Sequence, residues 1–356
     1  MDKIIINILK KIEKNGFDAY IVGGYVRNKV IGVFSSDIDI CTNALPKDII
    51  NIFKLDKNTK VHYGCVNIKT KKYNIDITTY RKESDYENHH PKTEYITDLK
   101  TDLKRRDFTC NSLIMDSNLN IIDYYDGIKD INNKIIKCVG STKNKLKEDP
   151  VRILRAIRFA TIYDFSIDEE IIDFINNNKN LIKNISYYRK KEELDKILSS
   201  NNKIKGLNLI KELNLCSTLD IKYDNINVSK DVLGMYAQLE FSDKYPLTKS
   251  ERNIINDIRS ILDIKEINNN TLYKYGLYIN IIAGEILNVD YIKINKLYKS
   301  LPIKSKDDIK IKKETLYKLN NDSYIGINDI YKELETNILN GKIKNKNKDI
   351  IKFLRK

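Results

Sequence analysis

Paired cysteines are missing from this chain of 356 residues. Its five cysteines are scattered and form no Cys-x-x-Cys pair; they are Cys41, Cys65, Cys110, Cys138 and Cys216. Such spacing argues against a zinc site and against a disulfide framework. We therefore expect the protein to work in a reducing compartment, the cytoplasm.

Long apolar runs are missing as well. No stretch approaches the ~20 apolar residues that a membrane span requires. Residues 1–17 have the pattern of a short amphipathic helix, and their apolar run is too short and too interrupted for a signal peptide. The sequence thus predicts no membrane association, and nothing in it indicates an obligate protein partner.

Acidic residues are outnumbered, with 49 Asp and Glu against 63 Lys and Arg, for a net charge of +14. The excess is spread along the chain rather than gathered in a tail. A surface of this kind favours a polyanionic partner, above all nucleic acid. Because lysine, asparagine and isoleucine are abundant everywhere, part of the excess is also explained by solvated lysines that bind nothing.

The chain is long enough for two or more domains. Residues 1–140 mix helical and strand patterns, whereas almost only helical patterns follow from about residue 141. This change predicts an α/β domain followed by an all-helical region. Residues 81–98 are polar, contain Pro91 and lack periodicity, so they predict a mobile loop.

Two carboxylates close to a glycine pair are the first candidate site. Gly23 and Gly24 precede Asp37 and Asp39, which stand two apart in an apolar run typical of a strand and so share one face. Carboxylates placed in this way can hold Mg²⁺ together with phosphate oxygens. Glycines leave backbone N–H groups accessible to a phosphate. Alone, both patterns are common by chance.

A second cluster is Arg105-Arg106-Asp107. Guanidinium groups suit the phosphates of a nucleoside triphosphate, and a carboxylate suits its ribose hydroxyls. A surface group of ion pairs would have the same sequence, so this cluster gains weight only from its neighbours.

A third cluster begins with Glu148 and Asp149, before a predicted helix that opens at Pro150. Steps of three residues place the acid of Asp149 in one stripe with three bases, Arg152, Arg155 and Arg158. Cytosine and adenine share an edge with an amine donor beside a ring-nitrogen acceptor, and guanine and uracil present the reverse. A carboxylate and an arginine, as in Asp149 and Arg152, would accept C and A and reject G and U. A solvated charged face is the alternative interpretation of such a stripe.

Taken in order, these motifs resemble those of bacterial class II tRNA nucleotidyltransferases, the CCA-adding enzymes. The matching segments are GGYVRNKVIG, SSDIDICTNALP, DLKRRDFTCNS, IIDYYDGIKDI, EDPVRILRAIRFAT and NISYYRKKEELDKIL. The likeness is strong over residues 16–200, weak over 201–295, and moderate from Leu301 onward, where it points to the bacillus-type branch.

The resemblance implies an α+β protein with a polymerase-beta-like nucleotidyltransferase head, built on a mixed sheet, at residues 1–140. A helical neck at 141–200 would recognise the nucleotide base and bind RNA. A helical body at 201–295 and a tRNA-binding tail at 296–356 would follow. The implied activity is template-independent addition of CCA to the tRNA 3′ end from CTP and ATP, with Mg²⁺ as cofactor and release of pyrophosphate.

The resemblance also implies residue roles. Asp37 and Asp39 would bind Mg²⁺ and be catalytic, and Asp76 stands where a third carboxylate could lie. The remaining motif residues would bind the nucleotide: Gly24, Arg27, Arg106, Asp107, Glu148, Asp149, Arg152, Arg155 and Arg158.

Some positions depart from the family pattern. Asn28 stands where Asp is usual, and Tyr63-Gly64-Cys65 replaces His-Gly-Thr. The 81–98 segment reads Glu87-Asn88-His89-His90-Pro91 where the family usually carries an arginine. That loop is tied to switching from C to A in the family, so addition of the final A is the step affected. We expect His89 and His90 to be exposed or to contact RNA, since no carboxylate spacing supports a metal site.

Other functions stay open at this point. An enzyme that adds only the final A, as one half of a split CC/A system, and a bacterial poly(A) polymerase share these motifs. An inactive RNA-binding protein would not need the aspartate pair. A small-molecule nucleotidyltransferase would not need the Asp149 and Arg152 pair or a basic helical region.

Overall fold

The computed structural model describes residues 3–56, 58–70, 72–87, 90–319 and 326–355. The chain divides into two compact units, Met1–Leu219 and Asp220–Lys356. In the described residues, no helix combines the length and the apolar character that crossing a membrane would demand. All five cysteines are free.

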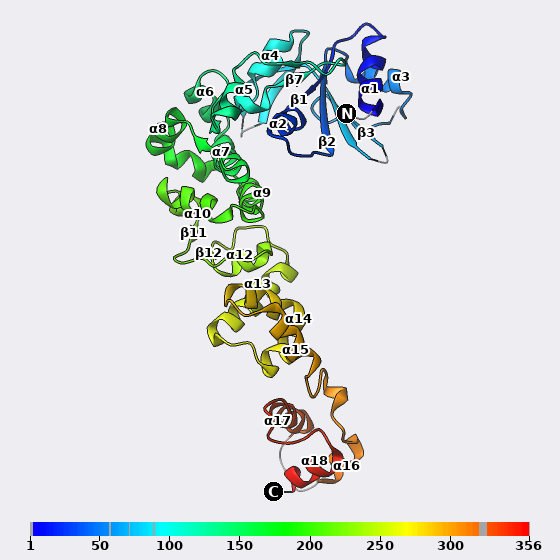
Figure 1. Ribbon diagram of the computed structural model, residues 1–356, viewed down its shortest axis with the longest axis vertical. Coiled ribbons are helices and arrows are strands. Elements are labelled where there is room, and N and C mark those ends of the chain that lie inside the picture. Colours follow the sequence, from blue (N-terminus) through cyan, green and yellow to red (C-terminus); the bar gives the residue numbers. More distant parts are fainter. Residues whose placement is uncertain (1–2, 57, 71, 88–89, 320–325, 356) are drawn as a thin grey trace. The chain divides into compact units, whose positions relative to one another are not determined.

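A six-stranded mixed sheet forms the centre of the N-terminal part, with strand order β3-β4-β2-β1-β7-β8. Its strands are β1 (Ala19–Val22), β2 (Asp37–Thr42), β3 (Cys65–Lys69), β4 (Asn74–Thr79), β7 (Ile114–Met115) and β8 (Ile121–Ile122). The helices of this part are α1 (Lys3–Glu13), α2 (Gly24–Ile31), α3 (Pro46–Phe53), α4 (Leu99–Lys104) and α5 (Gly127–Asn132). The mixed sheet confirms the predicted α+β architecture of the head (Figure 1).

Alternating apolar residues set the register of the central strands. Ile38 and Ile40 of β2 are buried, so the intervening aspartates face the opposite side. β2 runs parallel to β4, with Asp39 beside Asp76. The strand that carries the Asp-x-Asp motif therefore presents its carboxylates from the middle of the sheet, on one face.

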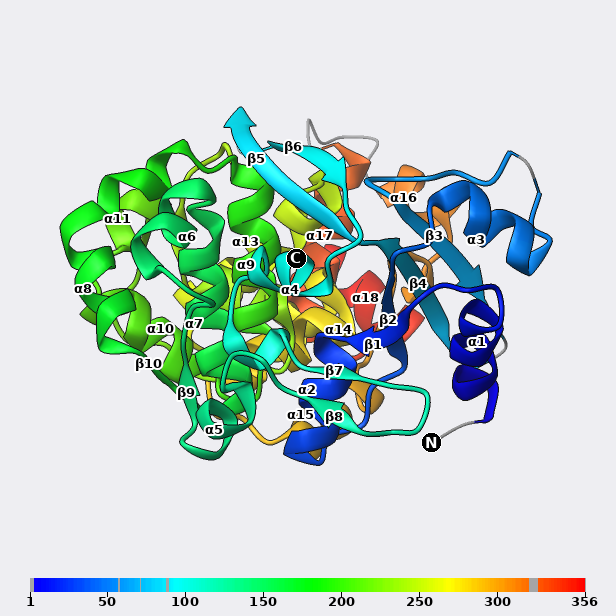
Figure 2. The same cartoon turned by 90° about the horizontal axis from the view of Figure 1, so that it is seen from above.

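The prediction of a loop over residues 81–98 is wrong for the described residues. They form the antiparallel pair β5 (Arg81–Glu87) and β6 (His90–Tyr95), and the helix α4 begins just after them at Leu99. Figure 2 shows this pair as a ribbon separate from the six-stranded sheet. A polar ribbon outside the core sheet lacks the apolar alternation by which strands are recognised in a sequence. His89, for which exposure or RNA contact is expected, lies outside the described residues.

Helices dominate the rest of the first unit. They are α6 (Thr142–Glu148), α7 (Val151–Tyr163), α8 (Glu169–Asn178), α9 (Tyr187–Leu198), α10 (Lys203–Glu212) and α11 (Cys216–Leu219). One short parallel pair, β9 (Ile135–Ile136) with β10 (Ser166–Ile167), interrupts the predicted helical run and ties it to the sheet-bearing part. Helix α7 is buried over most of its length because apolar and arginine side chains both face inward.

The second unit is almost wholly helical. Its helices are α12 (Val232–Ala237), α13 (Lys249–Ile264), α14 (Asn269–Ile286), α15 (Tyr291–Lys299), α16 (Lys313–Leu319), α17 (Ile327–Leu339) and α18 (Asn347–Leu354), and one short strand pair joins β11 (Ile221–Lys222) to β12 (Glu240–Phe241). Gly276, with φ 74°, breaks α14 into two segments. Leu316, Leu334 and Ile350 bring α16, α17 and α18 into one apolar cluster.

Candidate active site

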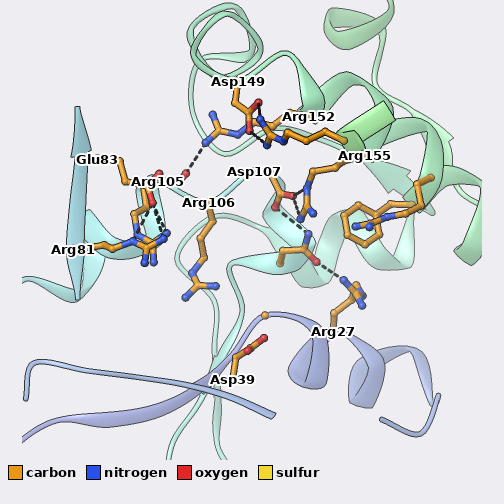
Figure 3. A pocket seen from close by; sticks show the side chains of 16 residues that line it. Arg27, Asp39, Arg81, Glu83, Arg105, Arg106, Asp107, Asp149, Arg152 and Arg155 are labelled. Carbon is orange, nitrogen blue, oxygen red and sulfur yellow. Dashed lines mark hydrogen bonds and ion pairs between the residues drawn. The ribbon is translucent and has the colours of Figure 1, made fainter. Parts of the chain in front are cut away.

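A cavity of about 570 Å³ opens in the first unit, where the sheet meets helices α6, α7 and α9. Its lining is strongly basic, with several arginines and few carboxylates (Figure 3). Nine residues predicted from the sequence line it, namely Gly24, Arg27, Asp39, Arg106, Asp107, Asp149, Arg152, Arg155 and Arg158. Three clusters that are far apart in the sequence are therefore brought to one site.

Two predicted residues do not line this cavity. Asp37 is exposed on β2, two residues before Asp39 and on the same face. Glu148 instead contacts the guanidinium of Arg152 at 3.1 Å. Glu148 directly precedes Asp149, and Asp37 stands two residues before Asp39, so both are close in the sequence to residues that line the cavity.

Neighbouring charges have opposing effects on the Asp39 carboxylate. Partial burial raises the pKa of Asp39, and the carboxylates of Asp76 and Asp37 raise it further. The guanidiniums of Arg106 and Arg27 oppose this rise. The Asp76 carboxylate accepts a hydrogen bond from Asn67 at 2.6 Å. A cation between Asp37 and Asp39 would relieve the repulsion that these carboxylates create.

Among the described residues, no group of three or more His, Cys, Asp and Glu side chains is arranged to hold a metal ion. Mg²⁺ commonly takes only one or two protein carboxylates and completes its shell with water and substrate phosphates. The pair Asp37 and Asp39 fits that smaller donor set, and its role as a metal site stays a prediction.

The turn between β1 and α2 requires glycine. Gly23 has φ 72°, a conformation that other residues adopt only with strain. A Cβ there would lie at ordinary contact distance from the Arg106 guanidinium (3.5 Å) and the Asp39 carboxylate (3.8 Å), so the backbone conformation is what requires glycine. The backbone can therefore approach a ligand closely at the N-terminal end of α2, which no side chain caps.

Asp107 is the centre of a hydrogen-bond network. It accepts from Arg155 at 2.6 Å and 2.8 Å and from the Asn111 amide at 3.0 Å. Although burial favours the neutral acid, Arg155, Asn111 and the Phe108 N–H together hold the pKa of Asp107 well below its usual range. The carboxylate is thus ionised and fixed in direction.

Arg27 differs from its neighbours in the charge of its partners. Among the described residues its hydrogen-bond acceptors are all neutral, namely Asn28, Asn111 and the Tyr163 hydroxyl. Its guanidinium also lies 4.5 Å from the centre of the Tyr163 ring. By contrast, Arg155 and Arg158 each pair with a carboxylate. Arg27 therefore brings to the cavity a positive charge that, among the described residues, donates a hydrogen bond to no carboxylate.

Asp149 and Arg152 lie at the junction of α6 and α7, both directed toward the cavity. The Arg152 guanidinium donates to the backbone carbonyls of Lys145 at 2.8 Å and Arg105 at 3.2 Å. The Asp149 carboxylate accepts from the Val151 N–H at 3.2 Å. These contacts fix the direction of both groups, and Arg152 is only 7% exposed.

Comparison with known proteins places the chain in a family. Residues 19–137 match the Poly A polymerase head domain, and residues 164–219 match the family described as "Probable RNA and SrmB- binding site of polymerase A". The CCA-adding enzyme of Ligilactobacillus salivarius is 32% identical over 342 residues, which cover 87% of this chain and 85% of that protein. The chain belongs to the CCA-adding enzyme family.

Solved structures show the same fold. The Bacillus stearothermophilus CCA-adding enzyme in complex with CTP superimposes with a TM-score of 0.85 at 23% identity, covering 99% of this chain and 96% of that one. The Thermotoga maritima CCA-adding enzyme complexed with tRNA has a TM-score of 0.72 at 21% identity, with 99% and 94% covered. The family resemblance and the nucleotidyltransferase class predicted from the motifs are thereby confirmed.

Sequence reasoning missed several residues that line the cavity of this member of the CCA-adding enzyme family. Asn111 stands four residues after Asp107 of the second cluster, and this spacing could have indicated that the two side chains interact. Arg81 and Glu83 were concealed by the predicted loop; they form an ion-pair network with Arg105, a residue of the second cluster, at the base of the β5–β6 ribbon. Arg189 comes from α9, 40 residues after Asp149, and the sequence holds no local signal of their contact.

Lys145 gives a prediction about stability. Burial, and next the Arg152 guanidinium, lower the pKa of Lys145 from 10.5 to about 8. Between these two values the unfolded chain binds more protons, so stability should rise with pH across this window. Lys145→Met should raise the free energy of unfolding at pH 7 by ~1 kcal/mol or more and remove this rise. Urea unfolding at pH 7, 9 and 10 measures both effects.

Lys143→Met is the matched control, since Lys143 is an exposed lysine of the same helix. It should leave the pH dependence of the wild type in place. Equal pH profiles for Lys145→Met and the wild type would contradict the assignment.

Proposed function

We propose that this protein adds CCA to the 3′ end of tRNA from CTP and ATP and releases pyrophosphate. The observation that supports it most is the meeting of three groups in one cavity. A sheet carboxylate, Asp39, lies there together with the Asp107 network and the Asp149 and Arg152 pair. These are the parts needed to hold the reacting phosphate, the ribose and the base of one nucleotide.

The triphosphate would lie between Arg27 and Arg106. Arg27 donates to no carboxylate among the described residues, and the buried Nε of Arg106 has no hydrogen-bond acceptor there. A phosphate oxygen would satisfy that buried donor, whose isolation is otherwise costly. The N-terminal end of α2 adds its partial positive charge.

The base would lie against Asp149 and Arg152. The carboxylate accepts from the exocyclic amine that cytosine and adenine share, and the guanidinium donates to the adjacent ring nitrogen. Uracil and guanine would place a carbonyl opposite the carboxylate and an N–H opposite the guanidinium. The protein then takes the place of a template strand.

Asp37 and Asp39 would hold Mg²⁺, the metal that the family implies. The chemistry of the donor set fits, because the two carboxylates share a face and the pKa of Asp39 is raised by burial and then by its neighbouring carboxylates. When bound, the ion supplies Lewis-acid stabilisation of phosphate charge and lowers the pKa of the attacking hydroxyl. The remaining contribution of the chain is to position the nucleotide, chiefly through Asp107, Arg27 and Arg152.

The tRNA would be bound mainly through its backbone. The net charge of +14 favours a polyanion. In the second unit, a separate cavity of about 820 Å³ is lined by five lysines, Lys342, Lys344, Lys346, Lys348 and Lys352. These lysines suit phosphate contacts in the tail, and the free cysteines suit a cytoplasmic enzyme.

Three synthetic tRNAs test this function: one lacking CCA, one ending in CC, and one complete. With CTP and ATP together, the first should be extended by three nucleotides and the third should not be extended. Addition of A to the second alone would identify an A-adding enzyme. Continued extension with ATP on all three would identify a poly(A) polymerase, and no extension of any would reject the proposal.

A further inference from the structure

The Asp149 carboxylate has a second side-chain partner in the cavity, Arg189, which lies in the segment NISYYRKKEELDKIL but to which the family resemblance assigned no role. The Arg189 guanidinium donates to both of its oxygens, at 3.2 Å to Oδ1 and 2.9 Å to Oδ2. A two-pronged contact of this kind fixes the plane of a carboxylate as well as its position. Arg189 also lines the cavity itself, and its side chain is 34% exposed.

Several contacts fix the position of helix α9, which carries Arg189. The Ser186 hydroxyl accepts from the Arg189 N–H at the start of the helix. One residue on, the buried Lys190 donates to the Thr218 carbonyl at 3.0 Å. One turn further along the same face, the buried Glu193 pairs with Arg158 of α7 at 3.2 Å. The ion pair between Arg189 and Asp149 thus connects α9 to the junction of α6 and α7, where Asp149 and Arg152 lie.

We propose that Arg189 is a positioning residue that determines specificity. It holds the Asp149 carboxylate in the direction needed to accept a hydrogen bond from the amine of cytosine or adenine. This inference rests on the proposed function. A carboxylate offers about four acceptor positions. Arg189 uses two and the Val151 N–H uses one. One position on Oδ2 remains for the base, so Arg189 stays bound while the nucleotide enters.

Loss of this contact should weaken selection more than catalysis. In Arg189→Ala the Asp149 carboxylate can turn, so UTP and GTP are rejected less well. The ratio of CTP to UTP incorporation, each as kcat/KM on tRNA lacking CCA, should fall by about tenfold. The KM for CTP should rise, while kcat at saturating CTP should change by less than about threefold. Arg189→Lys keeps the positive charge but cannot make the planar two-pronged contact, so it should restore only part of the ratio.

Lys196→Ala is the matched control, because Lys196 is an exposed cation of α9 that does not line the cavity; it pairs with Glu192 at 2.8 Å and lies farther, at 3.9 Å, from Glu193. It should keep the wild-type ratio. Thermal unfolding of each variant identifies loss of folding, and a destabilised Arg189→Ala is replaced by Arg189→Gln, for which the same ratio is expected.

Two results would overturn the inference while leaving the proposed function in place. Unchanged selectivity in a folded Arg189→Ala or Arg189→Gln would show that Asp149 needs no such support. A lower KM for CTP and ATP at unchanged selectivity would show that Arg189 competes with the base for Asp149. Failure of the wild-type protein to extend any tRNA would instead reject the proposed function.

Discussion

Replacing Asp39 by alanine should abolish nucleotide incorporation while leaving tRNA affinity within about threefold of the wild type. Asp39 is the carboxylate of β2 that lines the cavity, and Arg106 is directed toward it (Figure 3). Loss of a metal-binding carboxylate removes several kcal/mol of transition-state stabilisation, so the rate should fall at least roughly 1,000-fold. Single-turnover incorporation of labelled CTP and a filter-binding titration of tRNA measure the two quantities.

Asp18→Asn is the control for the loss of a negative charge. Asp18 is exposed before β1 and does not line the cavity, so this variant should incorporate CTP at the wild-type rate. Full activity in Asp39→Ala would refute the metal assignment. Equal loss of tRNA affinity and activity would show that Asp39 supports RNA binding or folding instead.

Replacing Asp149 by alanine should relax the choice of base. The carboxylate is the only acceptor that the proposal places opposite the amine of cytosine and adenine, so its removal takes away the basis for rejecting uracil and guanine. Discrimination between CTP and UTP should fall by about a hundredfold or more. Incorporation of each nucleotide alone on tRNA lacking CCA, compared as kcat/KM, measures the change.

Glu148→Gln separates the base contact from support of Arg152. Glu148 contacts Arg152 but does not line the cavity, and the amide still accepts a hydrogen bond. We expect a smaller loss of selectivity than in Asp149→Ala. Unchanged selectivity in a folded Asp149→Ala would contradict the template role.

The sequence predicted the strand that carries Asp39 because buried isoleucines alternate with aspartates along it. It predicted the α7 stripe because helical spacing aligns Arg152, Arg155 and Arg158, and their inward direction rules out a solvated face for this part of the chain. Apolar periodicity carries this kind of information reliably.

Periodicity within one segment could not predict contacts between segments that are far apart in the sequence. The pairing of Arg189 with Asp149 depends on how α9 packs against α7, and local patterns do not encode that packing. The β5–β6 ribbon was missed for another reason. Its strands, Arg81–Glu87 and His90–Tyr95, are polar and pair outside the core sheet, so no apolar alternation marks them.

The most direct test of the central claim is sequencing of the products made from tRNA lacking CCA with all four nucleoside triphosphates present in equal amounts. If the cavity selects bases without a nucleic-acid template, the extended molecules should end in CCA, with U and G nearly absent at each position. Products that contain U or G as often as C or A would contradict the account.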